Sequence, residues 1–129
     1  MTIRSFLDHH PKIGQRVFID ATAVVIGQVN LADDVSVWPM TVIRGDVNHI
    51  SIGAQSNIQD NCVLHVTHVG PYTPAGGALK IGDKVTVGHG AILHACEIGN
   101  SCLIGMGARI LDNAVMEPYS MLGAGSLLT

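Results

Sequence analysis

Three histidines have the residue type and the spacing that suit a metal site. His89 and His94 lie five positions apart in the segment 85–99, VTVGHGAILHACEIG, and His65 ends an earlier aliphatic run. Imidazole nitrogens are common zinc ligands, and a site with three of them leaves one position open for water. Water bound there becomes acidic enough to act as a nucleophile near neutral pH. The sequence therefore predicts that His65, His89 and His94 hold a metal ion.

The element that must position these histidines is a six-residue repeat. Glycine often follows the repeat start directly, and a small residue or valine often follows four positions later. This period is typical of a parallel β-helix, in which each hexad forms one strand and one corner, and three hexads form a coil. The sequence predicts an all-β fold of about six triangular coils. The eighteen starts are Ile13, Ile19, Val25, Leu31, Val37, Ile43, Ile52, Ile58, Leu64, Ile81, Val87, Leu93, Ile98, Ile104, Ile110, Met116, Leu122 and Leu128.

Length and composition agree with this fold. A chain of 129 residues predicts a single domain, 1–129. Hydrophobic residues make up 47% of the chain but aromatic residues only 4%, with 15 glycines, which suits stacked short strands. The net charge of −3 offers no basic surface for nucleic acid. No apolar run is long enough to span a membrane, and no apolar signal core begins the chain, so we expect a cytoplasmic protein.

Four segments depart from the repeat. Residues 1–12 have no periodicity and are expected to form an N-terminal arm or a lead-in strand. Two or three extra residues fall around 48–51, and one residue is missing before Ile98. The segment 66–80, VTHVGPYTPAGGALK, carries two prolines and three glycines and is predicted to be a loop that leaves the prism. The three cysteines are expected to be small buried thiols.

The repeat also predicts where the histidines lie. Arg44, His65 and His94 each follow a start on the third face, so they form one outward column. Adjacent coils are about 4.8 Å apart, close enough for His65 and His94 to share one ion. His89 lies at a corner after the second face and points away from this column. It would close a site on a neighbouring copy, which favours a homotrimer with three shared sites.

Other polar side chains lie beside the predicted ligands. Gln59 points outward on the second face, and Asp60 lies one coil before His89, where it would orient that ligand. Arg44 and Asp46, in the motif IRGD, are placed for an ion pair across the interface.

Three motifs resemble those of the gamma-class carbonic anhydrases. They are NIQDNCVLH at 57–65, VGHGAILH at 87–94 and IRGD at 43–46. The chain most resembles a bacterial branch often described as ferripyochelin-binding or hexapeptide transferase proteins. This resemblance implies a left-handed β-helix and a homotrimer, with His65 and His94 from one subunit and His89 from the next. It implies zinc as the metal, with iron or cobalt as alternatives.

The resemblance also implies roles for the neighbouring residues and an activity. Gln59 matches the residue that bonds the metal-bound solvent, and Asp60 matches its acidic neighbour. Arg44 and Asp46 match an intersubunit ion pair. The implied reaction is the reversible hydration of carbon dioxide to bicarbonate by a metal-bound hydroxide. The family usually adds a C-terminal helix, and we expect none within this sequence, which ends at Thr129 within a coil.

Two further functions are compatible with these residues. The glutamates that serve the best-characterised family member are absent: Val47 follows the RGD motif, and the loop 66–80 has no carboxylate. Proton transfer is therefore expected to be slow or assisted by buffer. The alternatives are an acyl-CoA thioesterase or acyltransferase, because such enzymes share the scaffold, and a metal-binding trimer with little activity.

Overall fold

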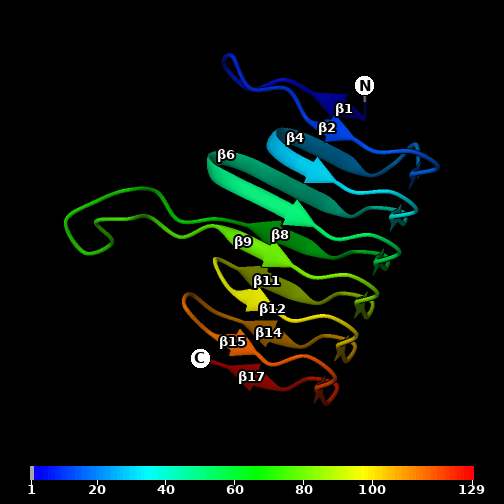
Figure 1. The fold of residues 1–129 in the computed structure, drawn as a ribbon, viewed down its shortest axis with the longest axis vertical. Coiled ribbons are helices and arrows are strands. Elements are labelled where there is room, and N and C mark those ends of the chain that lie inside the picture. Colours follow the sequence, from blue (N-terminus) through cyan, green and yellow to red (C-terminus); the bar gives the residue numbers. More distant parts are fainter. Residues whose placement is uncertain (1) are drawn as a thin grey trace.

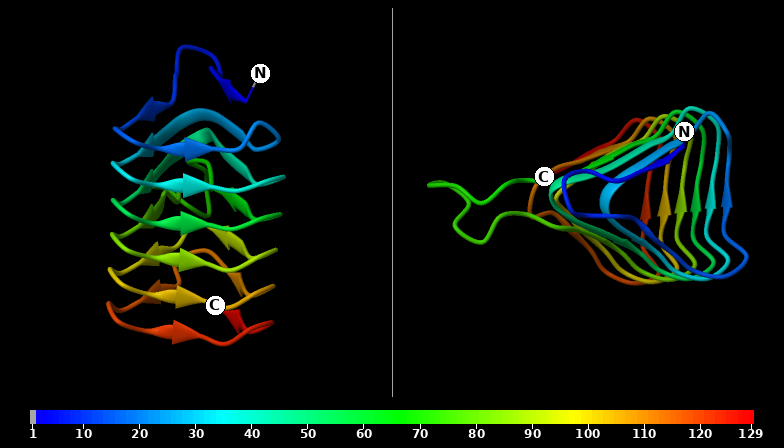
Figure 2. Two further views of the ribbon diagram at one scale, coloured as in Figure 1. Left: turned by 90° about the vertical axis from the view of Figure 1, so that its right-hand side faces the viewer. Right: turned by 90° about the horizontal axis from the view of Figure 1, so that it is seen from above.

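The chain folds as a left-handed parallel β-helix of triangular cross-section (Figures 1 and 2). The computed structural model describes residues 2–129, and these residues form strands and turns without a helix. None of them forms a helix long and apolar enough to cross a membrane. The prediction of an all-β solenoid of about six coils is confirmed, and strand β1 begins a further coil above the first.

The strands stack into three faces, and every predicted repeat start pairs with the start one coil away. Two long strands, β4 (Val24–Leu31) and β6 (Val42–Ile52), turn the corner from the third face to the first. The first face adds β2 (Lys12–Ile13), β9 (Leu79–Ile81), β12 (Glu97–Ile98) and β15 (Val115–Met116). The second face holds β3 (Phe18–Ile19), β5 (Ser36–Val37), β7 (Asn57–Ile58), β10 (Thr86–Val87), β13 (Leu103–Ile104) and β16 (Met121–Leu122). The third face adds β1 (Ile3–Arg4), β8 (Val63–His65), β11 (Ile92–His94), β14 (Arg109–Ile110) and β17 (Leu127–Leu128).

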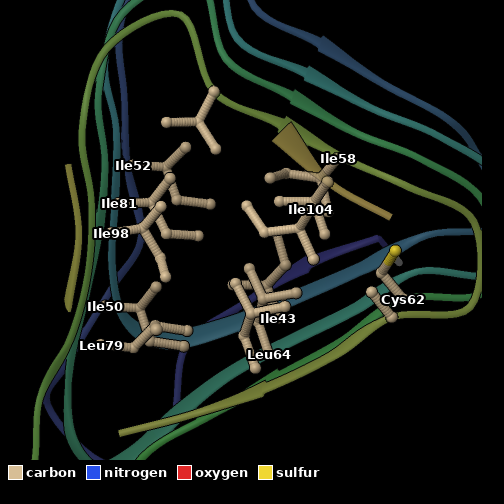
Figure 3. Close-up of a cluster of buried hydrophobic side chains, with 14 of the residues drawn as sticks. Ile43, Ile50, Ile52, Ile58, Cys62, Leu64, Leu79, Ile81, Ile98 and Ile104 are labelled. Atoms are coloured by element: carbon tan, nitrogen blue, oxygen red, sulfur yellow. The ribbon is translucent and has the colours of Figure 1, made fainter. Parts of the chain in front are cut away.

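The repeat starts fill the interior of the prism. Their side chains point inward from all three faces and stack on those of the neighbouring coils (Figure 3). Ile52, Ile81 and Ile98 form one such stack, and each is at most 3% exposed. At the first two corners a small residue or valine four places after the start is in most coils also buried, as Cys62 and Ala91 are. A core of aliphatic and small side chains therefore holds the coils together and fixes the register of the outward residues.

The corners follow a rule of backbone conformation. The residue three places after many starts lies in the left-handed region, with φ between 53° and 69° at examples such as Arg16, Gln55 and Gly90. This conformation is strained for most residues other than glycine and asparagine. The six-residue spacing repeats it in every coil at the first corner and in every coil after the first at the second corner, so these corners stack in register.

All three changes of length fall at the remaining corner, between the third face and the first. At the first of them the spacing between paired residues changes from 18 (Gly27 and Gly45) to 21 (Val29 and Ile50), so three extra residues form a bulge in β6. A Cβ on Gly45 would lie 2.5 Å from the Gln28 carbonyl oxygen, so the close approach of the two strands requires glycine there.

The loop projects from this same corner, and it is shorter than predicted (Figure 2). Val66 and Leu79 are buried in the core, and β9 begins at Leu79. The predicted segment 66–80 therefore included core residues at both ends, and the projecting part is 67–78. We call this part the corner loop. The expected lead-in strand at the N-terminus is β1, which pairs with β4.

Candidate metal centre

The outward residues of the third face bring two of the predicted ligands together. His65 ends β8 and His94 ends β11, and the register pairs them directly. Nδ1 of His65 lies 3.0 Å from Nε2 of His94, and the ring centroids are 5.0 Å apart. Both side chains are half-buried, with exposed fractions of 19% and 32%.

A carboxylate holds the other ring nitrogen of each of these histidines. Oδ1 of Asp46 lies 2.8 Å from Nε2 of His65, and Oδ1 of Asp112 lies 2.6 Å from Nδ1 of His94. The bulge in β6 turns Asp46 back toward the column, where it also pairs with Arg44 of the same chain. Asp112 comes from the next coil, two residues after the start Ile110.

Both carboxylates are held in the ionised form. Burial alone would raise the pKa of Asp46, but hydrogen bonds from His65 and a backbone N–H, together with the charge of Arg44, hold it below its usual value. Burial likewise opposes ionisation of Asp112, and hydrogen bonds from Thr67 and His94 outweigh it, so this pKa is also lowered. Each carboxylate therefore accepts a hydrogen bond from the histidine beside it.

The protonation of the two imidazole rings decides whether His65 and His94 suit a metal ion. An ionised carboxylate can only accept, so the ring nitrogen that faces it carries the proton, and in a neutral imidazole the other nitrogen is a lone-pair acceptor. Nδ1 of His65 and Nε2 of His94 are then two acceptors facing each other at 3.0 Å. Such a pair needs a cation between its members or an added proton. The donor set therefore fits a metal ion, with each ligand oriented by a carboxylate.

His89 lies apart from this pair, at the corner after β10. Its Nδ1 is 2.9 Å from Oδ2 of Asp60, one coil away, and its backbone N–H donates to Oε1 of Gln59 at 3.2 Å. A shallow hollow of about 350 Å³ lies beside it on the second face, and its lining residues are Trp38, Asn57, Gln59, Asp60 and His89. The imidazole is half-exposed, and Nε2 is the ring nitrogen that Asp60 leaves available.

Within one copy of residues 2–129, no three histidine, cysteine, aspartate or glutamate side chains are grouped so as to hold a metal ion. The described chain brings together His65, His94, Arg44 and Asp46 at the third face, and His89, Gln59 and Asp60 at the second. A site shared between subunits, and the intersubunit pairing of Arg44 with Asp46, stay predictions.

The sequence reasoning missed Asp112 and Thr67. Oγ1 of Thr67 donates a hydrogen bond to Oδ2 of Asp112, whose other oxygen holds His94. The repeat offered a signal for Asp112, because the residue two places after a third-face start lies at the edge of the outward column. Thr67 offered none, since its position depends on the path of the corner loop.

Comparison with known proteins agrees with this fold and with the motifs. No family model matches the chain. Protein YrdA from Escherichia coli is 57% identical over 110 residues, which cover 85% of this chain and 60% of that protein. Mitochondrial gamma carbonic anhydrase 2 from Arabidopsis thaliana is 42% identical over 98% of this chain and 45% of its own length. The chain thus spans about half the length of these relatives.

A solved structure of a hexapeptide transferase family protein from Anaplasma phagocytophilum superposes with a TM-score of 0.90. It is 43% identical, and the match covers 99% of this chain and 71% of that one. The N-acyltransferase AntD from Bacillus cereus matches with a TM-score of 0.61 at 17% identity, which reflects the fold alone. The chain belongs to the gamma carbonic anhydrase-like family of hexapeptide-repeat proteins.

Proposed function

We propose that this protein is a metal-dependent carbonic anhydrase that interconverts carbon dioxide and bicarbonate at sites shared between the subunits of a homotrimer. The observation that carries the proposal is the pair of facing nitrogens, Nδ1 of His65 and Nε2 of His94. A relative from Methanocaldococcus jannaschii, 46% identical, is named "Probable carbonic anhydrase", and one from Geobacillus kaustophilus, 44% identical, is named "Carbonic anhydrase".

His65 and His94 of one subunit and His89 of the next would hold the metal, which we propose to be zinc, with iron or cobalt as alternatives. Such an ion supplies Lewis acidity, which lets water act as a nucleophile near neutral pH. Asp46, Asp112 and Asp60 each take up the N–H of one imidazole, and so leave the opposite ring nitrogen free for the ion. These three carboxylates thus fix the orientation and the tautomer of the histidine rings.

Gln59 is proposed to position the attacking water. Its Oε1 accepts the N–H of His89, so its amide NH₂ group is the end left to donate into the hollow beside His89. Arg44 pairs with Asp46, and its charge adds to the hydrogen bonds from His65 and the backbone that lower the pKa of Asp46 against the effect of burial. The corner loop has no carboxylate to carry protons away, so proton export is expected to be slow or assisted by buffer.

The test is stopped-flow hydration of carbon dioxide by protein of known metal content. We expect a rate that rises in proportion to bound metal, rises further with imidazole buffer, and disappears in His94→Ala. A fully metal-loaded protein with no rate above that of the buffer would overturn the proposal.

Acyl-CoA thioester hydrolysis or acyl transfer is the second candidate, because the Anaplasma relative is described as a hexapeptide transferase family protein. The same preparations should be assayed with acetyl-CoA and longer acyl-CoA esters. Release of free coenzyme A that depends on His94, in protein without hydration activity, would favour this candidate. Metal binding without either activity would leave the role of a metal-binding trimer.

A further inference from the structure

We propose that Thr67 and Asp112 are positioning residues that connect the corner loop to His94, so that docking of the loop and binding of a metal ion stabilise each other. The proposal rests on the proposed metal site in one respect, namely that His94 is a ligand.

The connection runs through a single carboxylate. Oδ1 of Asp112 lies 2.6 Å from Nδ1 of His94, while Oδ2 accepts the hydroxyl hydrogen of Thr67. The two oxygens of a carboxylate move together, so a rotation of Asp112 that breaks one bond also disturbs the other. Thr67 therefore limits the rotation of Asp112, and Asp112 fixes the ring of His94. Groups that orient a metal ligand in this way affect metal affinity strongly.

Thr67 is also the residue that closes the base of the corner loop. Its N–H and C=O exchange hydrogen bonds of 2.9 Å with Gly77 at the other end of the loop. Its carbonyl oxygen accepts a further bond of 3.1 Å from Nδ2 of Asn48, in the bulge that also carries Asp46. One residue thus joins the loop to the segments that carry the carboxylate partners of His65 and His94.

The base of the loop packs closely on the strand end that carries His94. A Cβ placed on Gly77 would lie 2.8 Å from the Cβ of Ala95, the residue directly after His94. Gly77 thus lets the two backbone segments approach at a point where a larger residue would push the loop outward.

Beyond its base, the loop is held mainly by itself. Gly70 and Thr73 exchange backbone hydrogen bonds of 3.0 and 3.1 Å, and Oγ1 of Thr73 donates to the carbonyl of His68. Val69 and Tyr72 are 65% and 97% exposed. A segment with internal bonds and few core contacts opens at low cost, as a unit, about its attachment. The attachment is Thr67, so opening the loop removes one support of Asp112.

Reciprocity follows from thermodynamics. If a docked loop raises the affinity of His94 for metal, then bound metal must favour the docked loop by the same factor. This gives two independent measurements. One is zinc affinity, from competition with a chromophoric chelator, and the other is amide hydrogen exchange of residues 67–78 with and without zinc.

The variants are Thr67→Val, Asp112→Asn and the double variant, measured in the full chain. We expect each single variant to bind zinc about 10- to 100-fold more weakly. The double variant should bind no more weakly than Asp112→Asn alone, because both residues act through one contact. Thr67→Ser keeps the hydroxyl and should restore the affinity. Thr22→Val is the matched control, since Oγ1 of Thr22 donates to Asp20 at 2.6 Å away from the histidines.

Zinc should slow amide exchange in the corner loop of the wild-type chain, and this protection should be lost in Thr67→Val. Equal zinc affinity of Thr67→Val and the wild type, with loop exchange indifferent to zinc, would overturn the coupling. If the wild type bound zinc and His94→Ala bound it equally well, the metal site itself would be wrong, together with this proposal. Neither readout uses catalysis, so failure of the proposed reaction is distinguished from failure of the coupling.

Discussion

Nδ1 of His65 lies 3.0 Å from Nε2 of His94, and each ring gives its other nitrogen to a carboxylate on the far side. The row Asp46–His65–His94–Asp112 thus runs from β6 across the ends of β8 and β11 to Asp112, two residues after the end of β14. It presents two lone pairs to one point, and it does so with groups already oriented by the fold.

Mixing two inactive variants tests whether sites are shared between subunits. His89→Ala chains keep His65 and His94, whereas His94→Ala chains keep His89. If each site takes its ligands from two chains, trimers refolded from equal amounts of both should contain about a quarter of intact sites. Metal content by mass spectrometry should reach that fraction in the mixture and stay near zero in either variant alone. No recovery in mixed trimers would contradict sharing.

Gln59→Leu should separate water positioning from metal binding. Gln59 is not a predicted ligand, so metal content should not change, while kcat/KM for carbon dioxide hydration should fall about 10²-fold on loss of one oriented donor. Stopped-flow assays at equal metal occupancy measure this. Gln15→Leu, at an exposed first corner, serves as the control. An unchanged rate in Gln59→Leu would remove the role proposed for its amide.

Gly45→Ala should damage both the fold and the site. The new Cβ would meet the Gln28 carbonyl oxygen at 2.5 Å, so the strands must separate, at a cost of about 1–3 kcal/mol in the free energy of unfolding. The bulge that brings Asp46 to His65 begins directly after Gly45, so metal affinity should fall as well. Urea unfolding and zinc competition measure the two effects.

Gly123→Ala is the matched control, because its Cβ would have its nearest contact, Ser126 Oγ, at 3.4 Å. Equal stability of the two variants would show that the strands at Gly45 tolerate a side chain.

The buried thiols predict a loss of stability at alkaline pH. Burial raises the pKa of Cys62 to about 11 and that of Cys96 to about 12, from an ordinary value of 9.0. The thiols stabilise the fold fully below pH 9, where both states are protonated, and this contribution is lost as the pH rises toward 11–12. Urea midpoints should fall over that range. At pH 8 the native protein should resist a thiol reagent that labels all three cysteines once guanidinium unfolds the chain.

Rapid labelling of Cys62 or Cys96 in the native state would contradict this prediction, because the thiolate is the reacting species.

The sequence predicted the coil register because a six-residue period reports directly which side chain faces inward. Once Leu64 and Leu93 were assigned to the third face, His65 and His94 had to be neighbours, and β8 and β11 pair them. The repeat did not predict the contact of Asp112 with His94, because the two residues lie at different positions of their hexads. His94 is one residue after the start Leu93, whereas Asp112 is two residues after the start Ile110. The six-residue period places the end of the loop too late, because Leu79 is a core residue of β9 but lies two residues before the repeat start Ile81.

Every change of length in the solenoid lies at the corner between the third and first faces. These changes are the bulge of β6, the corner loop, and the spacing of five residues instead of six between Leu93 and Ile98. The other two corners keep six residues in each coil. Insertions and deletions at this corner can therefore change the length of the segments beside His65 and His94 without disturbing the pairing of strands on the three faces. In such a scaffold, the strands that carry His65 and His94 can keep their pairing while the segments that hold the carboxylates beside them change in length.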